Sequence, residues 1–453
     1  MDLRNQRILV VGLARTGIAA ARFLRNRGAL VRATDMATED RLAPEVKALG
    51  QMGIALELGG HRPESFTSAD LIVVSPGVPH TIPPLAAARA QGIPVIGEME
   101  LAGRFVREPI VAVSGTNGKT TVTEMVGAML AASGRRVFVG GNIGTPLIGH
   151  VDSGASVEVV VAEVSSFQLD TITGFRPAVG VLLNITDDHL DRYPDFDAYA
   201  AAKMRLFENQ RARDIAVLNG SDPVIGGRAA AIRSRKLFFS RSEPAGAGAA
   251  VAGSTLTLCL PGRDPVRLSL AAFKLPGPHN AENAAAASLA ALVAGAGPEG
   301  IQRVLDTFAP ARHRLEAIAT VDGVKYVNDS KATNVNAVRR GLECFGGGVV
   351  LIMGGVDKGG DFGLLRDAVR SRGRALILLG GTHDRIRAAL GRLVPTREAM
   401  SMREAVQAAR EMAAAGDVVL LAPGCASFDL YANYQERGDD FRREVLRLKK
   451  SNE

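Results

Sequence analysis

Residues 112–121 read AVSGTNGKTT, and this stretch is the strongest indication of the fold. An apolar run precedes it, glycines interrupt it, and the helical pattern VTEMVGAMLAAS follows it. Phosphate-binding loops have this strand–loop–helix context, but their common pattern is G-x-x-x-x-G-K-[ST]. Here Val113 stands where the first glycine of that pattern would be, and Gly115 follows two residues later. The stretch therefore predicts a shortened phosphate loop.

The residue types in this loop suit phosphate chemistry. Glycines let backbone N–H groups approach phosphate oxygens, and a helix N-terminus adds a partial positive charge. Lys119 can reach the β- and γ-phosphates of a nucleotide, and Thr120 can bind Mg²⁺. A glycine-rich turn with a lysine by chance is the alternative, which the strand–loop–helix context disfavours. The expected phosphate-binding residues are Gly115, Thr116, Asn117, Gly118, Lys119, Thr120 and Thr121.

Two later strands end in residues suited to a metal ion. The stretch VEVVVAEVSS places Glu163 at the end of an apolar strand, where a buried carboxylate has no structural use. Magnesium prefers hard oxygen ligands, so we expect Glu163 to bind it; a buried ion pair is the alternative. The next strand leads into NITDDHLDRY, which contains Asp187, Asp188, His189 and Asp191. We expect His189 to belong to the site, although a lone histidine is more often a satisfied surface or core residue.

Composition excludes several classes of protein. The 453 residues are 47% hydrophobic and 22% charged, which is typical of a soluble globular chain of about two to four domains. The net charge of +7 is spread out, which suits small anionic substrates better than nucleic acid. No apolar stretch approaches the ~18 residues that span a bilayer. Cys259, Cys344 and Cys425 lack disulfide or metal spacing, so we expect a cytoplasmic protein. From the spread of charge and the short apolar stretches we expect no nucleic-acid partner and no membrane partner.

Short apolar strands, glycine or serine turns and alanine-rich helices alternate along the chain, which predicts an α/β fold with mostly parallel sheets. We expect a Rossmann-like domain over residues 1–98 and a central P-loop ATPase-like domain over 99–310. A second Rossmann-like domain is expected over 311–453. The stretch SRSEPAGAGAAVAGSTLTLCLPG predicts loops and weak strands inserted in the middle domain. Ligands of such sheets collect at the carboxyl ends of the strands.

The first strand is followed by GLARTG at residues 12–17, and the next strand ends at Asp35. This imitates the dinucleotide fingerprint, in which an acid about 20 residues on binds the ribose. Ala14 replaces the middle glycine, so the match is weak. A dehydrogenase that binds NAD would also leave the phosphate loop unexplained.

The ordered motifs of the chain resemble the Mur ligase family. They are SGTNGKTT, GNIG at 141–144, EVSSFQLD, NITDDHLDRY, AYAAAKMRLF, PHNAEN, HRLE, NDSKATN, GGVDKGGDF and APGCASFDLY. A loop GTNGK[ST] without the usual first glycine characterises that superfamily. The resemblance implies ATP-driven amide formation, in which a substrate carboxylate becomes an acyl phosphate that an amino acid's amine attacks. The motifs fit best the family member that adds D-glutamate to UDP-N-acetylmuramoyl-L-alanine.

The resemblance also implies two Mg²⁺ ions. Lys203 in AAKMRLF would be carbamylated by CO₂ and would share the second ion with His189, while Thr120 and Glu163 would bind the first. Carbamylation requires an amine whose pKa is lowered by burial or by nearby positive charge. The sequence alone favours a helix-surface lysine at position 203. The expected catalytic residues are Lys119, Glu163, His189 and Lys203.

Further site residues follow from the resemblance alone. Asn280 and Asn283 would face the nucleotide, with Asn283 at the adenine. Without the resemblance, Asn280 is interpreted as a helix cap. For ATP the set is completed by Arg314 at the phosphates and Asp329 at the ribose. The UDP-substrate set is Ala14, Arg15, Thr16, Asp35 at the uracil, Ser75, Pro76, Gly77 and Asn142. The D-glutamate set is Lys331, Thr333, Lys358, Ser427 and Phe428, and Tyr434 would line the same pocket.

The sequence departs from the family's motifs at some positions, and alternative functions remain open. Met36 and Ala37 stand where polar residues are common in the family, which leaves the uracil contacts in doubt. A folylpolyglutamate-type ligase would carry its phosphate loop near the N-terminus, whereas about 110 residues precede it here. A sister Mur ligase that adds L-alanine or a diamino acid is a second rival, and a P-loop switch that binds a protein partner is a third. The family is mostly monomeric, so we expect a monomer.

Overall fold

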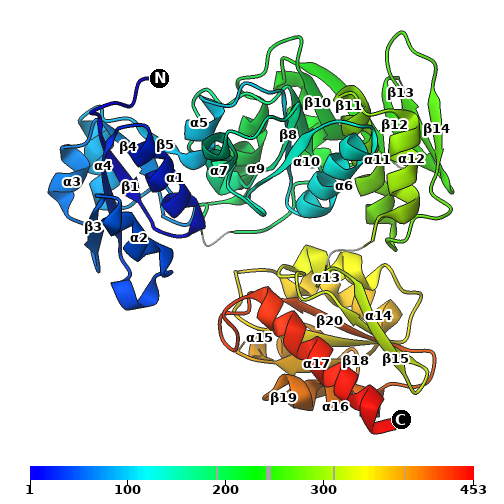
Figure 1. The fold of residues 1–453 in the computed structure, drawn as a ribbon. Helices are drawn as coiled ribbons and strands as arrows, with labels where there is room; N and C mark the ends of the chain where they lie inside the picture. Colours follow the sequence, from blue (N-terminus) through cyan, green and yellow to red (C-terminus); the bar gives the residue numbers. More distant parts are fainter. Residues whose placement is uncertain (190–191, 241–245, 310–311, 382, 453) are drawn as a thin grey trace. The chain divides into compact units, whose positions relative to one another are not determined.

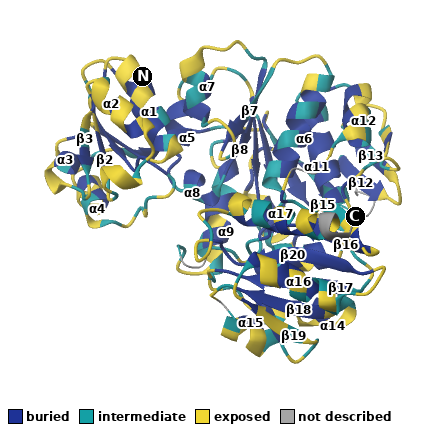
Figure 2. Ribbon diagram, turned by 60° about the horizontal axis from the view of Figure 1, so that its bottom comes forward, coloured by how far each residue is buried: buried dark blue, intermediate teal, exposed yellow. Residues whose placement is uncertain are grey.

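The computed structural model describes residues 1–189, 192–240, 246–309, 312–381 and 383–452. The chain divides into two compact units, and three β-sheets organise them (Figure 1). The first unit comprises residues 1–185, 197–268 and 285–304, and the second comprises 186–196, 269–284 and 305–453. Figure 2 shows the strands as mostly buried and the outward faces of the flanking helices as exposed. No helix of the described residues is both long and apolar enough to span a membrane.

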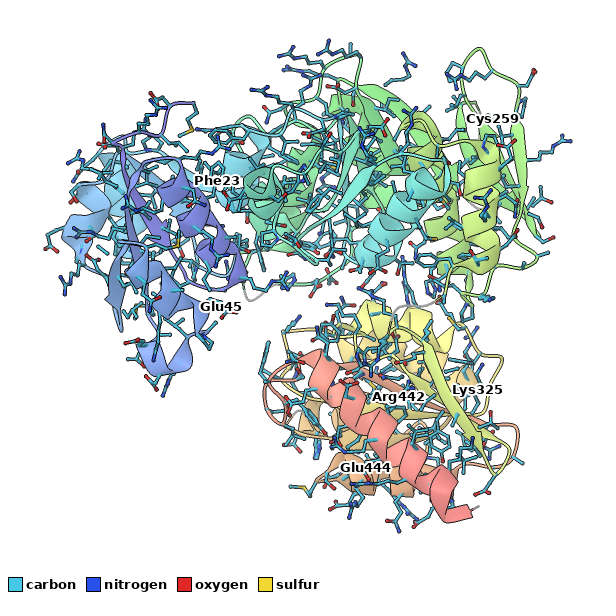
Figure 3. The ribbon with its side chains drawn as sticks, viewed as in Figure 1. Phe23, Glu45, Cys259, Lys325, Arg442 and Glu444 are labelled. Atoms are coloured by element: carbon cyan, nitrogen blue, oxygen red, sulfur yellow. The ribbon has the colours of Figure 1, made fainter. Side chains whose placement is uncertain are left out.

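The N-terminal sheet is parallel and has the strand order β3-β2-β1-β4-β5. Its strands are β1 (Arg7–Val11), β2 (Leu30–Asp35), β3 (Ala55–Leu58), β4 (Leu71–Val74) and β5 (Val95–Gly97). Its helices are α1 (Arg15–Asn26), α2 (Glu45–Gln51), α3 (Pro63–Thr67), α4 (Pro83–Ala90) and α5 (Glu98–Gly103). Phe23 of α1, labelled in Figure 3, is fully buried and packs edge-on against Phe105. The order reverses between β1 and β4, which is where ligands of doubly wound sheets bind.

The central sheet has nine strands in the order β14-β13-β12-β11-β10-β9-β6-β8-β7. They are β6 (Ile110–Ser114), β7 (Val137–Gly141), β8 (Val159–Glu163), β9 (Val179–Leu182), β10 (Ile215–Asn219), β11 (Arg235–Ser240), β12 (Gly248–Ala252), β13 (Thr255–Cys259) and β14 (Val266–Ser269). Pairing is parallel from β7 to β12 and antiparallel between β12 and β13. The Gly/Ala-rich stretch thus supplies β12 and β13, which lie between β11 and the edge strand β14. Because β6 lies between β8 and β9, its carboxyl end adjoins the ends of both.

The helices that accompany the central sheet are α6 (Lys119–Ala132), α7 (Leu147–Ser153), α8 (Ser166–Leu169), α9 (Phe196–Met204), α10 (Pro223–Arg228), α11 (Pro278–Val293) and α12 (Pro298–Thr307). On α9, whose sequence is FDAYAAAKM, the buried residues are Tyr199, Ala200, Ala202 and Lys203. The helix therefore buries one face and exposes the opposite one, which carries Asp197 and Ala201. Its lysine therefore lies inside the domain.

The C-terminal sheet has the order β15-β16-β20-β17-β18-β19 and pairs in parallel except between β15 and β16. Its strands are β15 (Glu316–Val321), β16 (Val324–Asn328), β17 (Val349–Gly354), β18 (Gly373–Leu379), β19 (Thr396–Ala399) and β20 (Val418–Gly424). Its helices are α13 (Val335–Leu342), α14 (Arg366–Arg372), α15 (His383–Leu390), α16 (Met402–Met412) and α17 (Tyr434–Asn452). Separate hydrophobic clusters pack on its two faces. The expected α/β class with mostly parallel sheets is confirmed.

Candidate active site

The predicted phosphate loop joins the end of β6 to the start of α6, so residues 115–118 form the turn. Gly118 has a φ of 86° directly before α6, a conformation that favours glycine. Gly115 has a φ of 148°, and a Cβ there would lie 3.0 Å from Leu183 Cβ. The two glycines allow a tight turn that ends at the N–H groups of the first helical turn.

Asn184, which follows β9, holds the loop in place. Its backbone carbonyl accepts from Thr116 N at 2.8 Å, and its side-chain oxygen accepts from Asn117 N at 2.8 Å. Its side-chain nitrogen donates to the Asn117 carbonyl at 3.0 Å. Asn184 is 2% exposed, so these bonds are sheltered from water. Sequence reasoning missed this role; the one available signal was an asparagine at the end of a buried strand that neighbours β6.

Two lysines converge on the Gly115 carbonyl. Lys119 Nζ donates to the carbonyls of Gly115 and Thr116 at 2.9 and 2.8 Å, and Lys203 Nζ donates to the Gly115 carbonyl at 2.8 Å. Lys203 is 2% exposed, and its Nζ lies 4.7 Å from the centre of the Tyr199 ring. The Tyr199 hydroxyl lies 3.1 Å from Thr116 Oγ1. The helix-surface alternative for Lys203 is therefore wrong, because Lys203 lies on the buried face of α9.

Glu163, the last residue of β8, is 2% exposed and accepts hydrogen bonds at both oxygens. Thr120 Oγ1 donates to Oε2 at 2.6 Å, and Asn142 Nδ2 donates to Oε1 at 2.7 Å. No Lys, Arg or His among the described residues forms an ion pair with Glu163, so the ion-pair alternative is wrong. The structure places Asn142 beside the predicted metal ligands, and its contact with the UDP-substrate stays a prediction.

The oxygens of Thr120 and Glu163 suit a magnesium ion that arrives with a nucleotide. Magnesium keeps several waters and is usually bound by one or two carboxylates together with substrate phosphates. No group of three or more His, Cys, Asp or Glu side chains in the described ranges is arranged to hold a metal alone. A hydroxyl and a carboxylate at the end of a phosphate loop therefore fit the ion better than a closed protein cage would.

His189 lies in the segment 186–196, which belongs to the second compact unit. Its φ is 57°, and its Nε2 lies 3.7 Å from Asp188 Oδ2. The same Asp188 oxygen accepts from Asn334 Nδ2 at 3.1 Å. The structure thus groups His189 and Asp188 with a loop of the C-terminal sheet. The role of His189 as a metal ligand stays a prediction, and Asp191 lies outside the described residues.

The residues predicted for the uracil and diphosphate gather at the switch point of the N-terminal sheet. Asp35 accepts from the backbone N–H of Leu13 at 2.6 Å and of Ala37 at 2.8 Å. Ser75 Oγ donates to the carbonyl of Gly12 at 2.7 Å. The carboxylate and the hydroxyl therefore hold together the turns that follow β1, β2 and β4.

A cavity of about 660 Å³ opens at these turns. Its lining residues are Gly12, Asp35, Met36, His61, Gly77, Val78, Pro79, Ile82, Pro83 and Pro84. Two of the predicted UDP-substrate residues, Asp35 and Gly77, are among them. Arg15, at the start of α1, instead donates to the carbonyl of Gly144 in the GNIG motif, and Thr16 is half-buried beside it.

A second cavity, of about 350 Å³, lies at the carboxyl end of the C-terminal sheet. Its polar and charged lining residues are Thr186, Asp187, Asp188, Thr333, Asn334, Asn336, Arg339, Asp357, Lys358 and Asp361. It thus brings together two residues predicted for D-glutamate, Thr333 and Lys358. A carboxylate ligand suits cationic and hydroxyl partners of this kind.

The other residues predicted for D-glutamate lie around the neighbouring loops. Lys331 Nζ lies 4.0 Å from the centre of the Tyr434 ring, which is a cation–π contact. Ser427 is buried, and its carbonyl accepts from the N–H of Tyr431 at 2.9 Å. Phe428 is 73% exposed. Their contacts with an amino acid stay predictions.

Arg437 of α17 is a buried residue that sequence reasoning missed. It is 2% exposed, and its guanidinium donates to Ser330 Oγ, to the Ser330 carbonyl and to the Cys425 carbonyl at 2.9–3.2 Å. It therefore ties the loop after β16, which carries Lys331 and Thr333, to the loop after β20. Its surroundings come from three separate parts of the sequence, which explains why no local pattern marks it.

The residues predicted for adenine and ribose lie in the second unit. Asn280 lies inside the first turn of α11, and its Nδ2 donates to the Pro276 carbonyl at 2.6 Å. A helix cap would have to precede the helix, so the interpretation of Asn280 as a cap is wrong. Asn283 Nδ2 donates to Asn280 Oδ1 at 3.1 Å. Asp329 accepts from Leu315 N at 3.2 Å, and the charge of Arg314 acts on it.

Asp329 makes the stability of the protein depend on pH. Burial raises the pKa of its carboxyl from 3.8 to about 7, despite the opposing effects of the Leu315 N–H and of Arg314. Between about pH 4 and pH 7 the folded state therefore holds a proton that the unfolded state has lost, so this group's contribution falls as pH rises. We expect Asp329→Asn to reduce the loss of unfolding free energy between pH 4.5 and 7.5, by at most on the order of 4 kcal/mol.

Denaturant unfolding at several pH values measures this effect. Asp322→Asn is the matched control, because Asp322 lies in the turn between β15 and β16 and is an exposed partner of Arg410. Parallel pH profiles for Asp329→Asn and the unsubstituted protein would contradict the raised pKa.

Comparison with known proteins agrees with these observations. Three family models match in order along the chain: the Mur ligase MurD-like N-terminal domain at residues 6–97, the Mur ligase middle domain at 113–291, and the Mur ligase glutamate ligase domain at 313–425. Each match covers one of the three sheets or most of it.

Full-length relatives give the same result. The chain is 53% identical to UDP-N-acetylmuramoylalanine–D-glutamate ligase of Desulfosudis oleivorans, over 99% of this chain and 98% of that one. It is 50% identical to the protein of the same name in Desulfatibacillum aliphaticivorans, over 99% and 100%. Its fold is similar to that of a pseudomurein peptide ligase type C from Methanothermus fervidus, with a TM-score of 0.62, 20% identity and coverage of 99% and 100%. The chain belongs to the Mur ligase family.

Proposed function

We propose that this enzyme joins D-glutamate to UDP-N-acetylmuramoyl-L-alanine, with conversion of ATP to ADP and phosphate, in the synthesis of peptidoglycan precursors. The observation that carries the ligase chemistry is the phosphate loop with Thr120 and Glu163 hydrogen-bonded at its end. The substrate assignment is supported by relatives that bear this name and match 99% of the chain. A glutamate ligase domain model also matches residues 313–425.

The geometry explains how two anions can react. The carboxylate of the nucleotide-sugar must approach the γ-phosphate of ATP, and the two repel each other. Lys119 and the N-terminus of α6 offset the phosphate charge, and the glycine turn fixes the phosphates in one orientation. Thr120 and Glu163 would hold Mg²⁺, which neutralises phosphate charge when bound. The acyl phosphate that forms is then attacked by the amine of D-glutamate, and phosphate leaves.

Two Mg²⁺ ions and a carbamylated Lys203 belong to this proposal. Burial of the Lys203 amine, with its Nζ 2.8 Å from the Gly115 carbonyl, supports a special role for this side chain. Reaction of the amine with CO₂ would replace a cation by an anionic oxygen ligand. We expect protein incubated with ¹³C-bicarbonate to show a carbamate carbon signal by NMR that is absent from Lys203→Arg. An unchanged spectrum in Lys203→Arg would contradict the assignment.

Lys358 tests the amino-acid end of the proposal. It lines the cavity of about 350 Å³ together with Thr333. Loss of one charge-assisted hydrogen bond to a carboxylate costs about 1.5–3 kcal/mol, so we expect Lys358→Ala to raise the KM for D-glutamate roughly 10- to 100-fold. The KM for ATP should stay within about twofold.

Lys325→Ala is the matched control for that measurement. Lys325 lies on β16 of the same sheet, is exposed and is labelled in Figure 3. An equal rise in the D-glutamate KM for both variants would contradict a specific role for Lys358.

Three further features complete the proposal: domains over residues 1–98, 99–310 and 311–453, a monomer, and action in the cytosol. The family models support the domain order, although residues 310 and 311 lie outside the described ranges. The three cysteines form no disulfide, which suits a reducing compartment. Light scattering of the purified chain would test the monomer, since a mass near twice 47.6 kDa would contradict it.

Phosphate release decides between the functions. The assay supplies ATP, Mg²⁺ and UDP-N-acetylmuramoyl-L-alanine and varies the D- or L-amino acid. Release that requires both D-glutamate and the nucleotide-sugar is the expected result. Dependence on another amino acid, or on a folate in place of the nucleotide-sugar, would make the chain a sister ligase. Release without any amino acid would favour an ATP-driven switch.

A further inference from the structure

The cavity of about 660 Å³ in the N-terminal domain has an apolar wall and few polar groups. Val78, Pro79 and Ile82 form part of the wall. Among the described residues that line it, Asp35 and His61 carry the polar side chains. A flat, uncharged ring such as a nucleobase suits an apolar wall with a small number of directed polar groups. The edge of that ring must then be recognised by Asp35, His61 or both.

Asp35 is already engaged in holding the protein together. Its two carboxylate oxygens accept from Leu13 N at 2.6 Å and from Ala37 N at 2.8 Å. The two residues after it, Met36 and Ala37, bring no polar side chain to the cavity. His61, which lies between β3 and α3, carries the other polar side chain of the cavity, and its ring is not needed to join these turns.

The His61 ring is held in one orientation. Its Nδ1 lies 3.0 Å from Thr34 Oγ1, and the Phe66 ring packs edge-on against it with centroids 5.5 Å apart. Thr34 Oγ1 also donates to the Gly60 carbonyl at 3.3 Å. We assign the hydroxyl hydrogen to the Gly60 carbonyl, an acceptor that has no hydrogen of its own, so the hydroxyl oxygen accepts from Nδ1–H. His61 Nε2 then carries no hydrogen, and it bonds to no described residue.

The charge state of His61 agrees with this arrangement. Burial lowers the pKa of the imidazole, and the nearby carboxylates of Asp35 and Glu57 oppose that effect without cancelling it. The ring is therefore neutral near pH 7, and the assignment of the Thr34 hydroxyl makes Nδ1 the donor and Nε2 an acceptor. An acceptor at the rim of an apolar cavity selects ligands that present an N–H group.

We propose that His61 Nε2 accepts a hydrogen bond from N3–H of uracil and so selects uracil over cytosine in the nucleotide-sugar. Uracil carries a hydrogen on N3, whereas cytosine has a lone pair there, which would face the lone pair of Nε2. This inference rests on the proposed function, because it takes the uridine diphosphate to bind in the N-terminal domain. It assigns base selection to a residue outside the sequence-predicted set, in a chain where Met36 and Ala37 supply no polar side chain.

Calorimetric titration of the full-length protein with UDP and with CDP tests the proposal, together with the KM of the nucleotide-sugar in the ligase assay. The unsubstituted protein should prefer UDP. Because one hydrogen bond accounts for about a tenfold change in affinity, His61→Ala should bind UDP roughly tenfold more weakly and CDP about equally. The KM for the nucleotide-sugar should rise by a similar factor, while kcat and the KM for ATP stay unchanged.

Two further variants separate recognition from folding. Thr34→Val keeps the shape of the residue but frees the ring, so it should lose part of the UDP preference with a near-native melting temperature. His383→Ala, in the C-terminal domain, should change neither ligand's binding. An undiminished UDP preference in His61→Ala would overturn the role of His61 and leave the proposed function standing. Failure of the unsubstituted protein to use or bind any uridine nucleotide would instead overturn the proposed function and the inference with it.

Discussion

Lys119→Met is expected to slow ADP formation by roughly a thousandfold, because it removes a positive charge placed at the phosphates. Lys119 is the first residue of α6, and its Nζ lies 2.9 Å from the Gly115 carbonyl and 2.8 Å from the Thr116 carbonyl. The side chain therefore curls back over the loop where the phosphates would lie. Methionine keeps the length and the helix propensity, so the loss isolates the charge. Steady-state ADP production with all three substrates measures it.

The control for Lys119→Met must remove a similar contact elsewhere. Lys236, on β11 of the same sheet, donates to the Ile232 carbonyl at 2.7 Å. Lys236→Met therefore loses a lysine-to-carbonyl hydrogen bond without touching the loop, and its activity should stay within about twofold. Activity of Lys119→Met within tenfold of the unsubstituted enzyme would show that backbone N–H groups and the metal suffice. A matching loss in Lys236→Met would show that the effect is structural.

The sequence contained enough local signal to predict the loop. An apolar strand, two glycines and a helix appear consecutively between residues 110 and 132, so their order in space follows their order in the chain. Glu163 was predictable for a related reason, since a carboxylate that ends a buried strand lies at the same sheet edge as the end of β6. The alternation of apolar strands and helices, together with the residue types at strand ends, was sufficient to predict the phosphate loop and the position of Glu163.

Contacts between distant segments were not predictable in this way. Asn184 bonds to Asn117 across 67 residues, and Arg437 bonds to Ser330 across 107. Each depends on which strands become neighbours, and single-strand patterns do not determine that order. The hydrogen bond from Asn142 to Glu163 also depends on strand order, because it forms where β7 pairs with β8. The burial of Lys203 was hidden because an alanine-rich helix shows little contrast between its faces.

The cavity of the N-terminal domain shows how a site can differ from its sequence motif. Asp35 matched the fingerprint position, yet the structure gives its carboxylate two backbone partners, Leu13 and Ala37. His61 has no motif of its own, and only the fold brings it to the same cavity. A single histidine that only the fold brings to a cavity leaves no spacing pattern in the sequence.

Glu163→Gln is expected to lower the turnover rate by roughly 100- to 1,000-fold and to raise the Mg²⁺ concentration needed for half-maximal activity at least about tenfold. Glutamine is nearly the same size but carries no charge. Its amide must also face two groups that now donate to the carboxylate, Thr120 Oγ1 at 2.6 Å and Asn142 Nδ2 at 2.7 Å. One of these contacts therefore becomes a clash between donors unless the Thr120 hydroxyl turns. Phosphate release as a function of Mg²⁺ measures both effects.

Glu100→Gln separates loss of the metal from loss of stability. Glu100 is 1% exposed and accepts from the N–H groups of Thr173, Gly174 and Phe175, so the variant should melt at a lower temperature. Its Mg²⁺ dependence should match that of the unsubstituted enzyme, because Glu100 lies outside the loop region. If Glu163→Gln shifted only the melting temperature and kept the Mg²⁺ dependence, Glu163 would be a structural partner of Thr120 and Asn142. A shift in Mg²⁺ dependence with little change in melting temperature would identify it as the metal's carboxylate ligand.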